Sequence, residues 1–351
     1  MAELLIYGAY GYSGRQIVAA AMRRGLRPIL AGRDEARLTA LGAEFGLPHR
    51  SFGLADHVPL ASGLSGVGVV LHCAGPFSAT SAPMLEACRA SGAHYLDITG
   101  EYRVMEAAAA RDADLRAAGV MAMCGVGMDV VPSDCLAAHL QRRLPGATRL
   151  EIYVRALERL SRGTAMTFVE GMGLPNVARE NGRLVERAAG ADRRRVQFGA
   201  RRVKMVGLPW GDITTAWHTT RIPNIAVYMS LMPGAPATIA FAGHFRRLLQ
   251  SPTVQRACKR LVQRFLSGPG QDYLDSHNAE FIGEVSDGAG HRRRSHLTTP
   301  EGYKFTAEAA AEIAGRVLAG TVQPGFQTPA GLFGPDFVLQ LAGTSRVDLD
   351  E

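Results

Sequence analysis

Glycines that separate two short apolar runs near the start of the chain limit the possible folds more than any other feature. The first run is Leu4–Tyr7, and the second is Pro28–Ala31, after a helical pattern over Arg15–Arg24. The glycines between the first run and the helix, each three residues apart, are Gly8, Gly11 and Gly14. A strand, a glycine turn, a helix and a second strand form the βαβ unit of dinucleotide-binding folds, so we predict that fold here.

Each glycine of this turn has its own expected role. Gly8 allows a sharp turn after the strand, Gly11 lets a diphosphate lie against the backbone, and Gly14 lets the helix pack closely on the sheet. The diphosphate would lie at the unpaired N–H groups of the helix start, where the helix dipole favours negative charge. The residues predicted to bind the cofactor in this turn are Gly8, Tyr10, Gly11, Tyr12, Ser13 and Gly14.

The end of the second strand indicates which dinucleotide is bound. Units that bind NAD usually place Asp or Glu there to bond the ribose hydroxyls, whereas this strand ends in Gly32-Arg33. A guanidinium at this position suits a 2′-phosphate by charge and geometry, so we predict NADP. The next residue, Asp34, is expected to cap a helix over Glu35–Phe45. The alternative is that Arg33 is a solvated loop residue.

Alternating strand and helix patterns continue to Met123 and predict six strands joined by five crossovers. Two of the later helices are predicted over Ser81–Ser91 and Tyr102–Ala118. The result is a doubly wound parallel α/β sheet, in which ligands bind outside the carboxyl ends of the strands. The loop after the fourth strand should therefore lie near the ribose and nicotinamide side of the cofactor. Its predicted cofactor-binding residues are Cys73, Ala74, Gly75, Pro76 and Phe77.

The loops after the fifth and sixth strands carry acids that could donate a proton to a substrate. The candidate catalytic residues are Glu101, Asp129 and Asp134. Structural roles stay open for them: Glu101 could cap the helix that follows it, and Asp134 could cap the helix that starts with Cys135. Asp97 could likewise orient backbone amides. Asp129 has the weakest structural explanation, because it follows two glycines and stands between apolar residues.

From about Gly146 the pattern changes and predicts a second domain built on another sheet. Its strand patterns are Leu150–Ala156, Val203–Val206, Thr214–Thr220 and Ile225–Leu231, followed by a hairpin of Phe281–Ser286 and Arg292–Thr298. The helices predicted in the second half of the chain are Gly163–Met172, capped by Thr164, and Ala307–Leu318, capped by Thr306. The polar span 181–200 is predicted to be a surface excursion.

Composition restricts the partners of this chain. The formal net charge is +7, nearly all of it from arginine, and no nucleic-acid motif accompanies it, so we expect no nucleic-acid partner. Five cysteines without a C-x-x-C pair indicate neither a disulfide framework nor a zinc site, and we expect no metal. The basic, amphipathic stretch 241–266 is expected to pack on the second domain or on a partner subunit, with peripheral membrane contact as the alternative.

Several short motifs occur together in an order found in one known group of proteins. They are the opening glycine turn, Ala31-Gly32-Arg33, the Cys73–Phe77 loop, Asp97–Glu101, the Gly125–Asp134 loop and Gly325–Pro329. On these motifs the chain resembles the saccharopine dehydrogenase-like oxidoreductases, and within them the trans-acting enoyl reductase branch. The resemblance extends over nearly the whole length of the chain.

The resemblance implies a Rossmann domain of residues 1–130, to which 306–351 return, and a second α/β domain of 131–305 with a mixed sheet. It also implies NADP and hydride transfer to either a C=C bond of enoyl type or a C=N bond. Lysine-releasing saccharopine dehydrogenases use a Lys/His pair, but no lysine precedes Lys204 here. A hydrophobic or carrier-bound substrate therefore fits better than an amino acid.

Two broader expectations complete the prediction. The chain is expected to be a cytoplasmic homodimer, with peripheral membrane association as an extension of that location. The alternative function is a protein that binds NADP as a redox sensor without turnover, or that binds a lipid or a protein partner.

Overall fold

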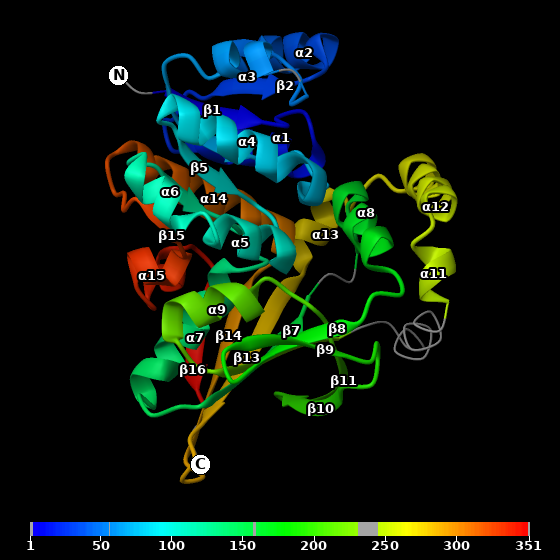
Figure 1. The fold of residues 1–351 in the computed structure, drawn as a ribbon, viewed down its shortest axis with the longest axis vertical. Coiled ribbons are helices and arrows are strands. Elements are labelled where there is room, and N and C mark those ends of the chain that lie inside the picture. Colours follow the sequence, from blue (N-terminus) through cyan, green and yellow to red (C-terminus); the bar gives the residue numbers. More distant parts are fainter. Residues whose placement is uncertain (1–2, 56, 157–158, 231–244, 350–351) are drawn as a thin grey trace. The chain divides into compact units, whose positions relative to one another are not determined.

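The computed structural model describes residues 3–55, 57–156, 159–230 and 245–349. These residues form two β-sheets with helices around them (Figure 1). The fold class predicted from the sequence is confirmed, because a parallel sheet of dinucleotide-binding type is combined with a second, mixed sheet.

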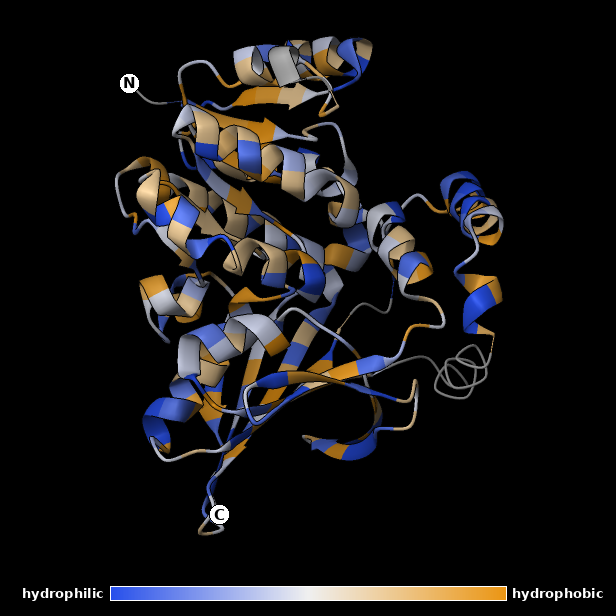
Figure 2. Ribbon diagram, viewed as in Figure 1, coloured by the Kyte–Doolittle hydropathy of each residue, from blue (hydrophilic) through white to orange (hydrophobic). Residues whose placement is uncertain are grey.

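The first sheet contains seven parallel strands in the order β15-β6-β5-β4-β1-β2-β3. Its strands are β1 (Glu3–Tyr7), β2 (Ile29–Gly32), β3 (His49–Ser51), β4 (Val67–His72), β5 (His94–Asp97), β6 (Met121–Met123) and β15 (Gly325–Gln327). The first six follow the order of a Rossmann sheet. Nearly all residues of the central strands are buried, as expected of parallel strands covered on both faces, and Figure 2 shows their hydrophobic character.

Eight helices in the described residues accompany these strands. They are α1 (Tyr12–Arg23), α2 (Glu35–Phe45), α3 (His57–Gly63), α4 (Phe77–Ser91), α5 (Tyr102–Ala109), α6 (Asp112–Ala117), α14 (Gly302–Leu318) and α15 (Pro329–Phe333). Helix α2 has the predicted bounds, and the Asp34 side chain caps it by accepting from the Arg37 N–H at 3.1 Å. The helix predicted over Tyr102–Ala118 is instead divided into α5 and α6.

Two helices in this part start earlier than predicted. Helix α4 begins four residues before the predicted Ser81, because a side chain from another loop caps its start. Helix α14 begins before Thr306, so Thr306 is not its N-cap; its hydroxyl accepts a hydrogen bond from the Met128 N–H at 3.0 Å. The seventh strand, β15, pairs in parallel with β6 and was not among the six strands predicted.

The second sheet is mixed and contains nine strands. They are β7 (Arg149–Arg155), β8 (Asn176–Glu180), β9 (Arg183–Arg187), β10 (Arg193–Phe198), β11 (Arg201–Gly207), β12 (Asn224–Ser230), β13 (Asn278–Ser286), β14 (Arg292–Pro300) and β16 (Ser345–Asp348). Seven follow the order β10-β11-β12-β7-β13-β14-β16, in which β12 and β7 are parallel and the other pairs antiparallel. The helices are α7 (Val131–Arg143), α8 (Arg162–Gly171), α9 (Asp212–Thr220), α11 (Arg246–Leu249), α12 (Pro252–Phe265) and α13 (Gln271–Ser276).

Two sequence predictions fail in this half for local reasons, and a third segment contains strands that were not predicted. The span 181–200 contains strands, because Asn181 and Gly182 both have positive φ and form a tight turn between β8 and β9. The span Thr214–Thr220 is part of helix α9 rather than a strand. There the Thr220 hydroxyl donates to the Ala216 carbonyl four residues earlier at 2.6 Å, a bond that a helix permits. The cap of α8 is Ser161 rather than Thr164.

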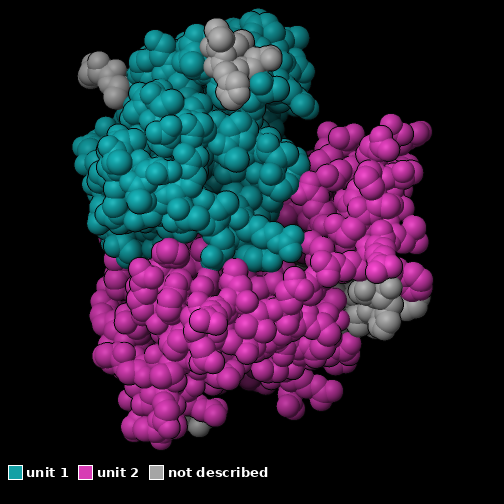
Figure 3. Space-filling view, in the orientation of Figure 1, with its two compact units in different colours: residues 1–131, 303–333 teal, residues 132–302, 334–351 magenta. Residues whose placement is uncertain are grey.

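The chain divides into two compact units, coloured separately in Figure 3. Unit 1 is Met1–Val131 with Tyr303–Phe333, and unit 2 is Pro132–Gly302 with Gly334–Glu351. The last stretch differs from the expectation that all of 306–351 would return to the first domain. Residues 334–351 fall in unit 2, because β16 forms an antiparallel ladder with β14.

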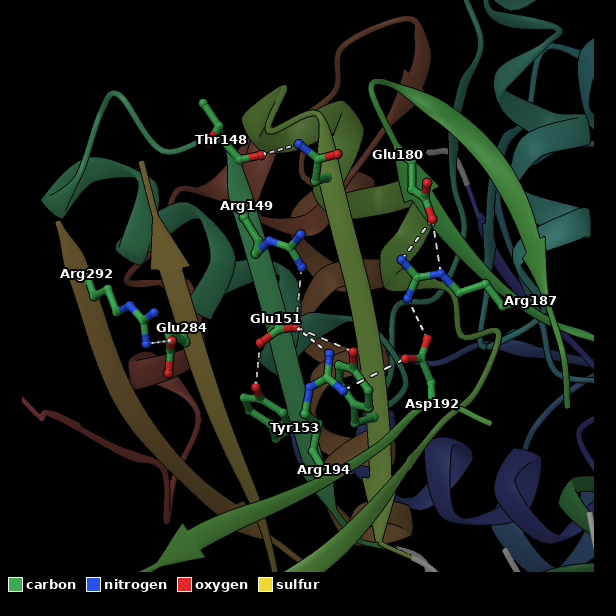
Figure 4. A network of polar contacts seen from close by, with 12 residues as sticks. Thr148, Arg149, Glu151, Tyr153, Glu180, Arg187, Asp192, Arg194, Glu284 and Arg292 are labelled. Carbon is green, nitrogen blue, oxygen red and sulfur yellow. Dashed lines mark hydrogen bonds and ion pairs between the residues drawn. The ribbon is translucent and has the colours of Figure 1, made fainter. Parts of the chain in front are cut away.

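A polar network stabilises one part of the unit 2 sheet. Glu151 and Glu284 are direct cross-strand neighbours on β7 and β13, and like charges in that position destabilise a sheet. Other side chains compensate: Arg149, Tyr153 and Arg194 contact Glu151, and Arg292 contacts Glu284 (Figure 4). These contacts attach the edge strand β10, through Arg194, to the centre of the sheet.

Candidate active site

The turn after β1 is too closely packed for side chains at two of its glycines. Gly8 has a φ of +83°, and a Cβ there would lie 2.9 Å from the Cβ of Ala74. A Cβ on Gly14 would lie 2.2 Å from the carbonyl oxygen of Gly8. Helix α1 therefore starts directly against the end of β1, as a diphosphate-binding turn requires.

The start of α1 has the properties of an anion site. Gly11 is its N-cap, and among the described residues no side chain caps the helix and no acid lies in its first turn. The first N–H groups of a helix have no partner within the helix, and they carry the positive end of its dipole. The backbone here fits a diphosphate group, because Gly11 leaves room for it and no carboxylate of that first turn would repel it.

Two guanidinium groups follow the end of β2. The Tyr10 hydroxyl accepts from the backbone N–H of Arg33 at 3.3 Å, and the Arg37 guanidinium donates to the Tyr10 carbonyl at 3.0 Å and lies 4.4 Å over its ring. Arg33 is exposed, and within the described part of the chain its guanidinium has no hydrogen bond or ion pair. Burial raises the pKa of Tyr7, the last residue of β1, to about 12. The positive charge of Arg33 opposes this rise, so the electric field of Arg33 reaches the Tyr7 side chain.

Arg37 is a candidate that the sequence reasoning missed. It lies in the first turn of α2, four residues along the chain from Arg33, which precedes the N-cap Asp34. This spacing was the available signal. Arg37 holds Tyr10 in place, and it supplies a second positive charge beside the position predicted for the 2′-phosphate.

The loop after β4 lies beside the glycine turn. The Cys73 N–H donates to the Tyr7 carbonyl at 2.8 Å, and Ala74 packs against Gly8. The Gly75–Pro76 peptide bond is cis, and the Thr80 hydroxyl donates to the Ala74 carbonyl at 2.7 Å. Burial raises the pKa of the Cys73 thiol, so this group stays neutral and is not a nucleophile.

His72, at the end of β4, is a second residue that the sequence reasoning missed. It is fully buried, and burial lowers its pKa to about 3, so the ring is neutral. Its Nε2 lies 3.0 Å from the Thr80 hydroxyl oxygen. Because that hydroxyl donates to Ala74, Nε2 is best assigned as the protonated nitrogen. His72 therefore supports the loop and does not exchange protons near neutral pH.

Glu101 binds the start of helix α4. Its carboxylate accepts from the Phe77 N–H at 3.0 Å and from the Ser78 N–H at 2.9 Å. Neither oxygen caps helix α5, which follows Glu101 in the sequence. Glu101 is therefore a capping residue, but for α4 instead of α5. With both oxygens bound to backbone N–H groups, Glu101 is a positioning residue for the loop that ends at Phe77, and its prediction as a proton donor has no support here.

Asp97 has the structural role predicted for it, whereas Asp134 does not cap a helix that starts at Cys135, because α7 already begins at Val131. Asp97 is fully buried and accepts from the Tyr95 hydroxyl and from the backbone N–H groups of Thr99 and Gly125. Asp134 lies in α7 of unit 2, where the Thr219 hydroxyl donates to it at 2.6 Å. This bond connects α7 to α9 within unit 2, whereas Glu101 and Asp129 belong to unit 1.

Asp129 is the acid whose environment suits proton transfer. Its carboxylate lies against Gly100, where a Cβ would be 2.8 Å from Oδ2. Burial and, second, the negative charge of Glu101 raise the pKa of Asp129 to about 7. The carboxyl can therefore hold a proton at neutral pH and release it, as a general acid must.

Replacing Glu101 with glutamine should separate its structural role from a catalytic one. We expect the free energy of unfolding in urea to fall by about 1–2 kcal/mol, because a charged acceptor is lost at a helix start. We also expect the pKa of Asp129 to fall, since one cause of its rise is removed, and an NMR titration of the carboxyl would measure this. Glu3→Gln, which breaks an exposed contact with Arg50, is the control with little effect on either quantity. Unchanged stability in Glu101→Gln would contradict the capping role.

Comparison with known proteins agrees with this geometry. Residues 4–123 match the family described as the saccharopine dehydrogenase NADP binding domain. A probable mitochondrial saccharopine dehydrogenase-like oxidoreductase of Arabidopsis thaliana is 30% identical over 149 residues, 38% of this chain and 33% of that protein. A trans-acting enoyl reductase of Mycobacterium leprae is 30% identical over 154 residues, 40% of this chain and 36% of that protein. The chain thus spans about a third of the length of these curated relatives.

A solved structure extends the likeness to both units. Apo saccharopine dehydrogenase (L-Glu forming) from Saccharomyces cerevisiae superimposes with a TM-score of 0.66 and covers 100% of both chains. The sequences are 11% identical, so the agreement concerns the fold.

Proposed function

We propose that this chain, whose residues 4–123 match the saccharopine dehydrogenase NADP binding domain family, is an NADP-dependent oxidoreductase. Its reaction would be the reduction of a C=C bond of enoyl type, or of a C=N bond, in a hydrophobic or carrier-bound substrate. The observation that carries this proposal is the turn at Gly8–Gly14, in which Gly8 and Gly14 have no space for a side chain and the helix start suits a diphosphate.

The cofactor would be held entirely by residues of unit 1. The backbone at Gly8, Gly11 and Gly14 would receive the diphosphate, and Arg33 with Arg37 would neutralise the 2′-phosphate. The loop from Cys73 to Phe77 would lie on the nicotinamide side, where Glu101 fixes it.

Reduction of such a bond adds a hydride to one atom and a proton to its neighbour. When bound, NADPH supplies the hydride. The Asp129 carboxyl would supply the proton and regain one from water, because its pKa of about 7 allows both forms near neutral pH. Glu101 would act indirectly, since its charge helps to keep Asp129 protonated.

Two observations favour the enoyl bond over the imine. Relatives named trans-acting enoyl reductase, 28–30% identical, are among the similar proteins. In addition, residues 1–131 of unit 1 contain no lysine, so a Lys/His pair within unit 1 would have to use Lys304 of α14. A 2-enoyl thioester with a long acyl chain is therefore the first substrate to test.

Replacing Arg33 with alanine tests the cofactor assignment. We expect NADPH to bind roughly tenfold to a hundredfold more weakly, as expected for the loss of a charge-assisted hydrogen bond, while NADH binding stays unchanged. Quenching of protein fluorescence by each nucleotide would measure both constants. Arg27→Ala, at the other end of β2, is the matched control and should bind NADPH like the original protein.

Two outcomes would contradict the proposal at different levels. Equal affinity of the original protein for NADPH and NADH would remove the role of Arg33. Tight NADPH binding without oxidation of the cofactor by any enoyl thioester or imine would favour the alternative, a redox sensor without turnover.

A further inference from the structure

Helices α11 and α12 form a strongly basic segment of unit 2. We call residues 245–265 the basic arm (yellow in Figure 1). The stretch 245–271 contains no aspartate or glutamate. Its cations are Arg246, Arg247, Arg256, Lys259, Arg260 and Arg264. Such a one-sided charge is attracted to an anionic surface.

Large apolar side chains of the same arm are exposed to solvent. Leu248 is 59% exposed, Leu261 is 58% exposed and Phe265 is 73% exposed. Leu261 and Phe265 are four residues apart in α12, so they lie on one face of that helix. Figure 2 shows apolar and polar residues side by side on α12. Apolar groups gathered on a surface in this way mark an interaction site.

The opposite side of α12 is attached to its own unit. Lys259 forms an ion pair with Glu170 of α8 at 2.5 Å. The side-chain amide of Gln255 donates to the Val169 carbonyl at 2.9 Å. The contacts of α12 with α8 thus use one side of the helix and leave the face with Leu261 and Phe265 uncovered by the described residues.

Cations border the exposed apolar face. Arg260 and Arg264 are exposed, and in the described ranges neither forms an ion pair with an acid. The Arg264 guanidinium lies 5.7 Å from the ring centre of Phe265, so charge and apolar surface are adjacent. An apolar face bordered by Arg and Lys is the pattern of a helix that lies in a lipid interface.

We propose that the basic arm binds the surface of an anionic lipid bilayer. Leu261 and Phe265 enter the boundary between head groups and acyl chains, and the arginines contact lipid phosphates. An acidic protein would satisfy the charges but would not by itself explain apolar side chains that are exposed by half or more. No helix among the described residues has the length and hydrophobicity to cross a membrane. This inference is independent of the proposed reductase activity.

The proposal corresponds to peripheral membrane contact, which was the alternative predicted from the sequence for the stretch 241–266. Residues 241–244 of that stretch lie outside the described residues, and the inference uses only 245–265. A location at the bilayer surface would also suit a hydrophobic substrate, although the binding test does not depend on it.

Vesicle co-sedimentation of the full chain tests the proposal. The vesicles are phosphatidylcholine alone, and phosphatidylcholine with a quarter of phosphatidylglycerol. We expect binding to the anionic vesicles that weakens as salt is added. Arg260→Gln/Arg264→Gln should weaken this binding roughly thirtyfold, the effect of two cations near an anionic surface. Leu261→Ser/Phe265→Ser should weaken it at least about tenfold, because less apolar surface enters the lipid.

Matched controls lie elsewhere on unit 2. Arg195→Gln/Arg202→Gln removes two exposed arginines from β10 and β11, and Val347→Ser removes an apolar side chain that is 59% exposed. Both controls should bind anionic vesicles like the original protein. NADPH affinity and thermal unfolding, measured on every variant, show that each is folded and that unit 1 is unaffected.

Three outcomes would overturn the proposal. The first is equal sedimentation with neutral and anionic vesicles, or with none. The second is an equal loss of binding in the β10–β11 control, which would mean that net charge alone is responsible. The third is a change from dimer to monomer in Leu261→Ser/Phe265→Ser without vesicle binding by the original protein, which would assign the face to a second copy of the chain.

Discussion

Gly14→Ala is expected to abolish measurable NADPH binding. The added Cβ would lie 2.2 Å from the Gly8 carbonyl oxygen and 3.0 Å from its carbonyl carbon, so the backbone of the turn must move. Both partners of this clash are part of the surface that would receive the diphosphate. We expect affinity to fall at least about a hundredfold, and overpacking to lower the free energy of unfolding by about 1–3 kcal/mol.

The control for this variant is a glycine without close neighbours. Gly53 lies in unit 1 and a Cβ there would meet nothing within 4 Å, so Gly53→Ala should change neither affinity nor stability by much. Isothermal titration with NADPH and urea unfolding would measure both variants. If Gly14→Ala kept the affinity of the original protein, the turn would not be the diphosphate site and the proposed function would lose its main support.

The order of elements in unit 1 could be predicted because each signal is local. Apolar runs such as Val67–His72 have the length and composition of buried parallel strands. Asp34 marks the start of helix α2, because its side chain accepts from the backbone N–H of Arg37, three residues later. The seventh strand could not be predicted in the same way. This strand, β15, has only the three residues Gly325–Gln327. It forms because it pairs with β6, which lies far away in the sequence at Met121–Met123.

In unit 2 local signals and tertiary structure disagree. The β-branched residues of α9 favour a strand, yet the segment is a helix in which Asp212 to Ala216 are all fully buried, so tertiary packing overrides the local preference. The span 181–200 is rich in arginine and polar residues and was predicted to be a surface excursion, without any strand. The Asn181-Gly182 pair was the signal that identifies a hairpin there.

The roles of the acids depend on contacts that no spacing reveals. Glu101 caps α4, which begins 24 residues earlier, and Asp134 accepts from Thr219, 85 residues later. The sequence therefore placed three acids in equivalent positions, whereas the structure gives them three environments. The environment of Asp129, beside Gly100 and near the charge of Glu101, raises its pKa to about 7.

Asp129→Asn is expected to have the largest effect on turnover. An amide cannot donate the proton, so kcat/KM with an enoyl thioester should fall by roughly a hundredfold to a thousandfold, the usual contribution of a general acid. In the original protein the rate should be constant below about pH 7 and fall about tenfold per pH unit above it, because the donor form of Asp129 is lost. The variant should show a low rate without this fall. NADPH affinity, measured in parallel, should stay the same.

Stability provides a second readout for Asp129 that needs no substrate. Its folded pKa of about 7 exceeds that of an unfolded aspartate, about 3.9, so the native state binds more protons between these values. Stability from this group is complete below about pH 4 and is lost as the pH rises to about 7. Asp129→Asn should therefore unfold at a higher temperature than the original protein at about pH 8, and the gain should vanish near pH 4. Asp134→Asn is the control, since the amide oxygen can still accept from Thr219 and the substitution should leave the pH dependence of the rate unchanged. A pH profile that Asp129→Asn leaves intact would exclude Asp129 as the donor.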